Sequence, residues 1–209
     1  MKIAEFRKNI HPNLFSWEEF ADIINNRPLI SKSRLNVLQS SKRYEWKVPH
    51  WSSDSTSVSS TIIREIVENE IIYLSDMSRC TKKLNALAAD IENIFKTPVD
   101  AHIYSCRNTE IPHPFGAHFD DSHNIIVQCE GITNFKIWEA DTNLKRNNNL
   151  DPEALRNIVL DVDMEPGDQL RIPVGYPHLA TSKTKRLSVS FPIKVTPGIM
   201  EDRTWVNFD

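Results

Sequence analysis

A segment of twelve residues, 167–178, constrains the fold of this chain more than any other feature of its sequence. It has the pattern G-x5-P-x-G-x2-H, from Gly167 to His178. Gly167, after a proline, favours a tight turn into a short strand, and Pro173 and Gly175 favour a second turn at its end. We expect the second turn to direct His178 inward. The segment therefore predicts a β structure with a polar side chain aimed at its interior.

Short β-type runs extend this pattern through the second half of the chain, and turn residues separate them. They lie at 101–106, 124–129, 134–139, 158–163, 168–172, 178–182 and 186–193. Many short strands at this spacing favour a sandwich or jelly roll. We therefore expect residues 100–193 to form two facing antiparallel sheets.

The N-terminal part has helical periodicity instead, over about 17–25 and 81–96, with one strand-like run at 71–74. The predicted fold is mainly β with N-terminal helices, a double-stranded β-helix (cupin/jelly-roll). We expect a single domain over 1–209. Its parts would be a helical part over 1–95 packing on the barrel, the β-helix core over 96–195, and a tail over 196–209.

His118 and Asp120 form a second informative pattern, HxD. In a strand, residues i and i+2 point to the same face, so the two side chains would meet at one point. With His178 they supply two histidines and one carboxylate, the ligands of a facial triad. Zinc fits these ligands too, but this set, with room for a chelating co-substrate, favours Fe(II).

The two patterns resemble the two cupin motifs. Asn124 and Gly131 follow the HxD pattern at the spacing of the first motif, H-x-H-x3-E-x6-G, with Asp120 for the second His and Asn124 for the Glu. Over about residues 70–193 the chain resembles the JmjC-cupin branch that includes the ribosomal oxygenases, most closely at 101–105, 118–131 and 172–178. Because the sequence ends at Asp209, we expect it to lack the dimerisation and winged-helix regions that follow the β-helix there.

The resemblance implies an Fe(II)- and 2-oxoglutarate-dependent dioxygenase, a hydroxylase that also uses O2. Its metal ligands, which are also its catalytic residues, would be His118, Asp120 and His178. Hydroxylation outranks demethylation, because nothing resembles a methyl-lysine aromatic cage.

The residues that would bind 2-oxoglutarate depart from the family in one place. The ribosomal oxygenases have a Lys or Arg fifteen residues after the first ligand histidine, and here that position is Thr133. We expect Arg186 to hold the distal carboxylate instead, because an Arg fork suits a carboxylate and Arg186 opens an R-x-S element like that of other 2-oxoglutarate oxygenases. Tyr104 and Asn124 would add hydrogen bonds.

Two other cations are weaker candidates for this role. Strand parity places Lys136 on the face opposite Thr133. Arg171 is a further possibility, since the family usually has an aromatic residue there.

Composition limits the partners. The formal net charge of −3 gives no sign of a nucleic-acid-binding surface, and no apolar run suggests a signal peptide or a membrane span. Three widely separated cysteines suggest reduced thiols in the cytoplasm. We expect a protein, peptide or small-molecule substrate, the last of these amino-acid-derived. The polar run at 52–60 is either a surface connection or an active-site lid, and the oligomeric state stays open.

Two alternatives to a hydroxylase remain. A metal cupin that works without 2-oxoglutarate, as a dioxygenase or isomerase, is favoured by Thr133 and opposed by the HxD carboxylate. A non-catalytic binding module on the cupin fold is the other, because a fold does not determine function.

Overall fold

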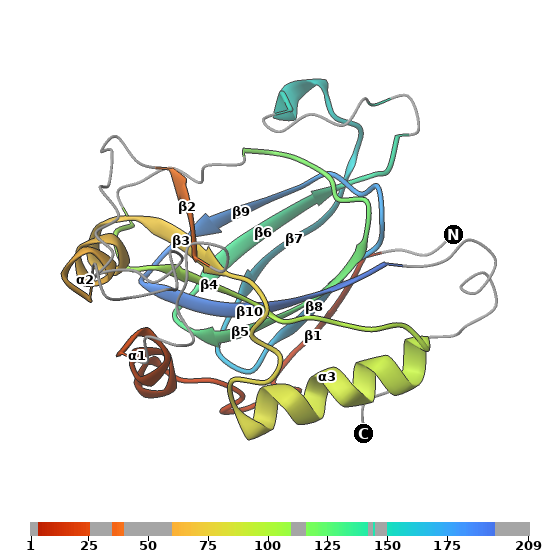
Figure 1. The fold of residues 1–209 in the computed structure, drawn as a ribbon. Coiled ribbons are helices and arrows are strands. Elements are labelled where there is room, and N and C mark those ends of the chain that lie inside the picture. Colours follow the sequence, from red (N-terminus) through yellow and green to blue (C-terminus); the bar gives the residue numbers. More distant parts are fainter. Residues whose placement is uncertain are drawn as a thin grey trace.

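The computed structural model describes residues 4–25, 35–39, 60–109, 116–141, 144 and 150–194. Most of the polar run, 52–59, and the tail, 196–209, lie outside these residues. Within them, a seven-stranded sheet faces a three-stranded sheet (Figure 1). Every strand pair described is antiparallel. The predicted pair of facing antiparallel sheets is confirmed.

The strand order of both sheets is that of a double-stranded β-helix, in which the chain from β5 to β10 crosses repeatedly between the two sheets. The large sheet has the order β1 (Glu5–Arg7), β8 (Gln169–Ile172), β5 (His123–Glu130), β10 (Arg186–Ile193), β4 (His102–Cys106), β3 (Ile71–Leu74), β2 (Leu35–Gln39). The small sheet has the order β7 (Ile158–Met164), β6 (Thr133–Trp138), β9 (His178–Ser182).

The prediction that residues 1–95 are a helical part packing on the barrel needs correction. Three strands from this part, β1, β2 and β3, belong to the large sheet itself. Only β3 was predicted. The three residues of β1 are too few to show a hydrophobic period, and their pairing with β8 is made across more than 150 residues of sequence.

Three α-helices, α1 (Trp17–Asn25), α2 (Ser60–Asn69) and α3 (Lys82–Phe95), and a short 3-10 helix (Pro152–Ala154) complete the described fold. A capping box begins α1: Ser16 N donates to Glu19 Oε2 (2.9 Å), and Glu19 N donates to Ser16 Oγ (3.2 Å). Thr81 caps α3 by accepting from Leu84 N (3.2 Å). No described helix is long and apolar enough to cross a membrane.

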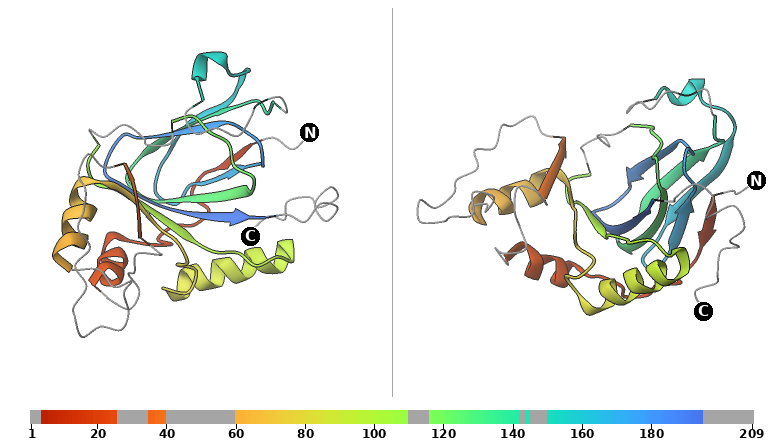
Figure 2. Two further views of the ribbon diagram at one scale, coloured as in Figure 1. Left: turned by 45° about the horizontal axis from the view of Figure 1, so that its top comes forward. Right: turned by 45° about the vertical axis from the view of Figure 1, so that its right-hand side comes forward.

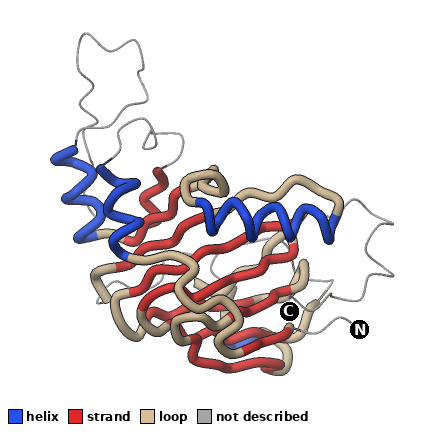
Figure 3. Tube along the Cα trace, turned by 90° about the horizontal axis from the view of Figure 1, so that it is seen from below, coloured by secondary structure: helices blue, strands red, loops and turns tan. Residues whose placement is uncertain are grey.

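All three α-helices lie on the side of the large sheet that faces away from the small sheet (Figure 2), and α3 lies over its strands (Figure 3). One core fills this layer between helices and sheet. The alternation along β10 shows how it forms: Leu187, Val189 and Phe191 are fully buried in that core. The intervening residues point the other way, into the space between the sheets.

The space between the sheets holds both a second core and a cavity. Ile126 and Leu170 of the large sheet pack there with Phe135 and Ile137 of the small sheet. The rest of the space is open and lined by polar side chains. The fold therefore places its larger core outside the barrel and leaves part of the interior for a site.

Gly131 carries the chain from one sheet to the other. Its φ is +71°, and a Cβ there would collide with the backbone oxygen of Lys185. The next residue, Ile132, accepts from Lys183 N (2.9 Å) and donates to Thr184 Oγ1 (2.8 Å). Because these bonds join the turn before β6 to the turn before β10, the first residues of both strands, Thr133 and Arg186, enter the barrel at the same end.

Candidate metal centre

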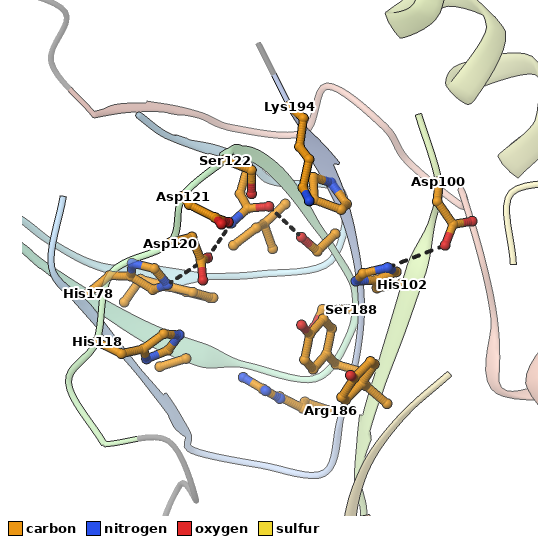
Figure 4. A pocket seen from close by; sticks show the side chains of 18 of the residues that line it. Asp100, His102, His118, Asp120, Asp121, Ser122, His178, Arg186, Ser188 and Lys194 are labelled. Carbon is orange, nitrogen blue, oxygen red and sulfur yellow. Dashed lines mark hydrogen bonds and ion pairs between the residues drawn. The ribbon is translucent and has the colours of Figure 1, made fainter. Parts of the chain in front are cut away.

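The structure brings His118, Asp120 and His178 together, as the two sequence patterns predict. One possible ligand atom from each residue lies within 4.8 Å of the others. The two histidines form an isolated antiparallel bridge: His178 N donates to His118 O (2.7 Å) and His118 N to His178 O (3.1 Å). Gly175 N donates to Asp120 O (3.1 Å). Figure 4 shows the three side chains converging at one side of the cavity.

The reason for this convergence differs from the one expected. His118 and Asp120 do not lie in a regular strand, since the local pairing stops at His118. Strand parity therefore does not align the two side chains. Asp120 is instead placed by the backbone bond from Gly175, in the turn that Pro173 and Gly175 form before His178.

Both histidine rings are oriented by a backbone carbonyl oxygen that lies beside Nδ1. His118 Nδ1 lies 3.2 Å from Gly116 O, and His178 Nδ1 lies 3.0 Å from Tyr176 O. A carbonyl can only accept, so each Nδ1 carries the proton and each Nε2 keeps a lone pair for a metal. Burial and the nearby His118 lower the pKa of His178 to about 4, against the opposing effect of Asp120. His178 is thus neutral, the form that binds metals.

A cavity of about 640 Å³ extends from these three residues between the two sheets. The inner faces of β4, β5 and β10 form one wall, and β6 and β9 form the other. Residues that line it include Tyr104, Asn124, Phe135, Arg186, Ser188 and Ser190. A cavity of this size holds a small molecule as well as a metal ion.

The strand register gives the cavity a direction. Ser190 pairs with His102, near the start of β4, whereas Arg186 pairs with Cys106 at its end. The triad lies at the Ser190 level, because Asn124 contacts both Asp120 and Ser190. Four residues of strand span about 13 Å. The Cα of Arg186 therefore lies about 13 Å along β10 from the level of the triad, toward the opposite end of the cavity.

Arg186 is the most unusual residue in this cavity. It is 2% exposed, and its Nε and Nη1 have no hydrogen-bond partner among the described residues. Burial lowers the pKa of its guanidinium, while the neighbouring Cys106 and Tyr104 oppose this effect. Figure 4 shows the side chain pointing into the cavity. Buried cations are normally paired, so this one fits an anionic ligand.

The other predicted co-substrate residues take different positions. Tyr104 lines the cavity, stacked on Tyr73 with ring centroids 5.5 Å apart, and burial, with Asp120 nearby, raises its pKa. Asn124 lines the cavity and donates to Asp120. Thr133 is fully buried, but it is not among the residues that line the cavity.

The two weaker cation candidates lie elsewhere. Lys136 is on the outer face of the small sheet, with Nζ 3.5 Å from Asp161 Oδ2, as strand parity predicts. Arg171 is on the large sheet, with Nη1 3.3 Å from Glu5 Oε2, and it does not line the cavity. Among these cations, only Arg186 reaches the cavity.

Several lining residues escaped the sequence analysis. Ser188 and Ser190 form part of the cavity wall, and so do Tyr73 and His102 near its rim. The two serines had a usable signal, since they follow Arg186 at a spacing of two on one strand. Tyr73 had none, because its strand precedes the predicted barrel.

A double-stranded β-helix with two histidines and one carboxylate at one end of its cavity defines a cupin-type metal protein of the JmjC class. The JmjC domain family matches residues 74–199, more than half of the chain, and the chain belongs to this family.

Relatives and solved structures agree with this assignment. The chain is 22% identical over 211 residues to the bifunctional lysine-specific demethylase and histidyl-hydroxylase NO66 of Drosophila grimshawi, covering 99% of this chain and 28% of that protein. It is 26% identical over 189 residues to NO66 of Brugia malayi, covering 81% and 24%. It therefore spans about a quarter of these relatives.

The Escherichia coli ribosomal oxygenase YcfD, solved with cobalt and 2-oxoglutarate, superposes with a TM-score of 0.61 at 20% identity. The superposition covers 94% of this chain and 49% of YcfD. At this identity the likeness shows a shared fold.

Proposed function

We propose that this chain is an Fe(II)- and 2-oxoglutarate-dependent hydroxylase. The observation that carries the proposal is the buried Arg186, which lies in the same cavity as the triad and has two unpartnered nitrogens in the described structure. 2-Oxoglutarate has two unlike ends: a 2-oxo acid that chelates a metal and a distal carboxylate that needs a cation. A cavity with a metal triad at one end and a buried Arg at the other suits both ends.

The donor set fits iron. His118, His178 and Asp120 would hold the ion through two imidazoles and one carboxylate, which leaves coordination positions open for a co-substrate and O2. Bound iron, 2-oxoglutarate and O2 together supply the oxidation of a substrate C–H bond. YcfD, with cobalt and 2-oxoglutarate bound on a similar fold, supports these cofactors.

The remaining residues would bind and orient 2-oxoglutarate. Arg186 would bind its distal carboxylate through the guanidinium fork, and the Tyr104 phenol would donate beside it. Apolar walls such as Phe135 would keep water away and so strengthen the ion pair. Thr133 would contribute through its small size. The first residues of β6 and β10 lie at the same end of the barrel, so the short Thr133 side chain leaves room for the long Arg186 side chain.

Protein or peptide substrates fit best, because the name of NO66 describes action on lysyl and histidyl groups and YcfD is called a ribosomal oxygenase. Amino-acid-derived molecules stay as alternatives. The three cysteines in the described residues are all free, which agrees with a cytoplasmic location.

The competing metal cupin without 2-oxoglutarate has one point in its favour, the Thr133 replacement. It offers no anion for Arg186, however, and a buried cation without an anion is costly. A non-catalytic module leaves the two oriented histidines unexplained.

Anaerobic titration with Fe(II) and 2-oxoglutarate tests the proposal. We expect a weak visible charge-transfer band in the wild type, and succinate formation once air is admitted. Asp120→Ala should abolish both while the metal-free protein melts nearly as before, because Asp120 is at the cavity rim, 32% exposed. Metal binding without the band would favour the metal cupin, and no metal binding would favour the module.

A further inference from the structure

The carboxylate of Asp120 is held by a chain of side chains that lies outside the triad. Asn124 Nδ2 donates to Asp120 Oδ2 at 2.5 Å. At the other end of the same amide, Asn124 Oδ1 accepts from Ser190 Oγ at 3.4 Å. Ser190 is on β10 and Asn124 on the neighbouring β5, so the chain crosses between two central strands of the large sheet.

Burial restricts the movement of the Asn124 and Ser190 side chains. Asn124 and Ser190 are each 6% exposed, while the Asp120 side chain is 32% exposed. The Asp120 carboxylate can only accept, so the NH2 group of Asn124 faces it, and the amide oxygen at the other end accepts from the Ser190 hydroxyl. The buried pair thus fixes a ligand that its own surroundings would leave free to rotate.

A carboxylate can offer a metal one oxygen or both. Here Oδ2 already accepts the Asn124 amide and lies 3.7 Å from His178 Nε2. Rotation that would present both oxygens equally breaks the Asn124 bond. With two histidines and one carboxylate oxygen, three of six octahedral positions stay open.

We propose that Asn124, held by Ser190, is a positioning residue of the metal centre: it fixes Asp120 as a one-oxygen ligand and so keeps three positions open for 2-oxoglutarate and O2. This inference rests on the proposed function. It gives Asn124 a role through Asp120, in addition to any contact with the co-substrate.

Co(II) titration of the full chain, without 2-oxoglutarate, tests this role through affinity and the visible Co(II) spectrum. Asn124→Ala should weaken Co(II) binding by about 10–100-fold, as losses behind a ligand typically do, and should change the spectrum. Ser190→Ala should weaken it by about 2–5-fold, the value of one long hydrogen bond. In the Asn124→Ala background, Ser190→Ala should have no further effect, because Ser190 acts only through Asn124.

Ser105→Ala is the matched control, since Ser105 is also fully buried but its Oγ has no partner among the described residues. It should leave Co(II) affinity unchanged. If Asn124→Ala fails to fold, as judged by circular dichroism, Ser190→Ala carries the test alone through its weaker affinity.

Wild-type affinity and spectrum in Asn124→Ala would overturn the inference, as would a full additive effect of Ser190→Ala. Either result, with the wild type binding Co(II) normally, leaves the proposed function standing. A wild type that does not bind Co(II) refutes both.

Discussion

Replacement of Arg186 by Met should make the ligand-free protein more stable and at the same time abolish its response to 2-oxoglutarate. Met retains an unbranched apolar stem but removes a buried guanidinium with two unpartnered nitrogens. Apolar replacement of buried ionic groups is often neutral or stabilising by about 1–4 kcal/mol. Taking about 2 kcal/mol, and about 2–4 °C per kcal/mol for a domain of this size, we expect Tm to rise by roughly 4–8 °C.

The effect on 2-oxoglutarate has the opposite sign. Loss of one partner of a buried charge pair costs about 3–5 kcal/mol, so binding should weaken by about 100-fold or more. At a concentration 100 times the wild-type Kd, 2-oxoglutarate stabilises the wild type by about 2.7 kcal/mol. If the Kd of the variant is 100-fold higher, the same concentration stabilises the variant by only about 0.4 kcal/mol.

Thermal unfolding with Co(II), with and without 2-oxoglutarate, measures both quantities in one experiment. Arg186→Lys is the intermediate variant, and it should recover only part of the ligand shift because a point charge cannot reproduce the fork. Two results would refute the reasoning. One is a ligand-free Tm several degrees below that of the wild type, which would show that Arg186 supports the fold. The other is an undiminished 2-oxoglutarate shift in the Met variant.

Three further predictions concern residues away from the triad. Lys136 is on the outer face of the small sheet, and exposed ion pairs contribute little, so Lys136→Ala should leave 2-oxoglutarate turnover within about twofold of the wild type. Loss of turnover would mean that the β6 register is wrong. Gly131→Ala should lower stability by about 2–4 kcal/mol in urea unfolding, because φ is positive and a Cβ would meet backbone; an unchanged midpoint would contradict the turn geometry. His11 contacts Gln169 Oε1 (2.8 Å), and burial lowers its pKa, so the unfolded chain takes up the proton first as pH falls through about 6.5. The wild type should therefore lose more Tm than His11→Gln between pH 7.5 and 5.5, and parallel pH profiles would count against the buried position of His11.

The barrel was predictable because its strands are punctuated by turn residues. The expected runs at 178–182 and 186–193 coincide with β9 and β10, and the others agree within one or two residues. β1 and β2 were not predicted, because each is short and gains its strand conformation from a neighbour far away in sequence. Secondary structure of this kind is imposed by pairing, which no local pattern records.

For the candidate site, the sequence indicated which residues meet but not how. The HxD spacing suggested a shared strand face, whereas a bridge and a turn bring His118 and Asp120 to His178. Asn124 was expected to face the co-substrate, and its bond to Asp120 became visible only with the side-chain positions. The assignment of these residues as ligands stays a prediction until the titrations are done.

The eight residues of strand β10 serve the packing of the fold on one face and the cavity on the other. Leu187, Val189 and Phe191 support the packing of the helices, so selection for a folded protein acts on them. Arg186, Ser188 and Ser190 contact only the cavity side, where small hydroxyl side chains leave space rather than fill it. Changes in the second set should therefore alter ligand and metal binding, while the first set preserves the fold, so one strand carries two separable properties of the molecule.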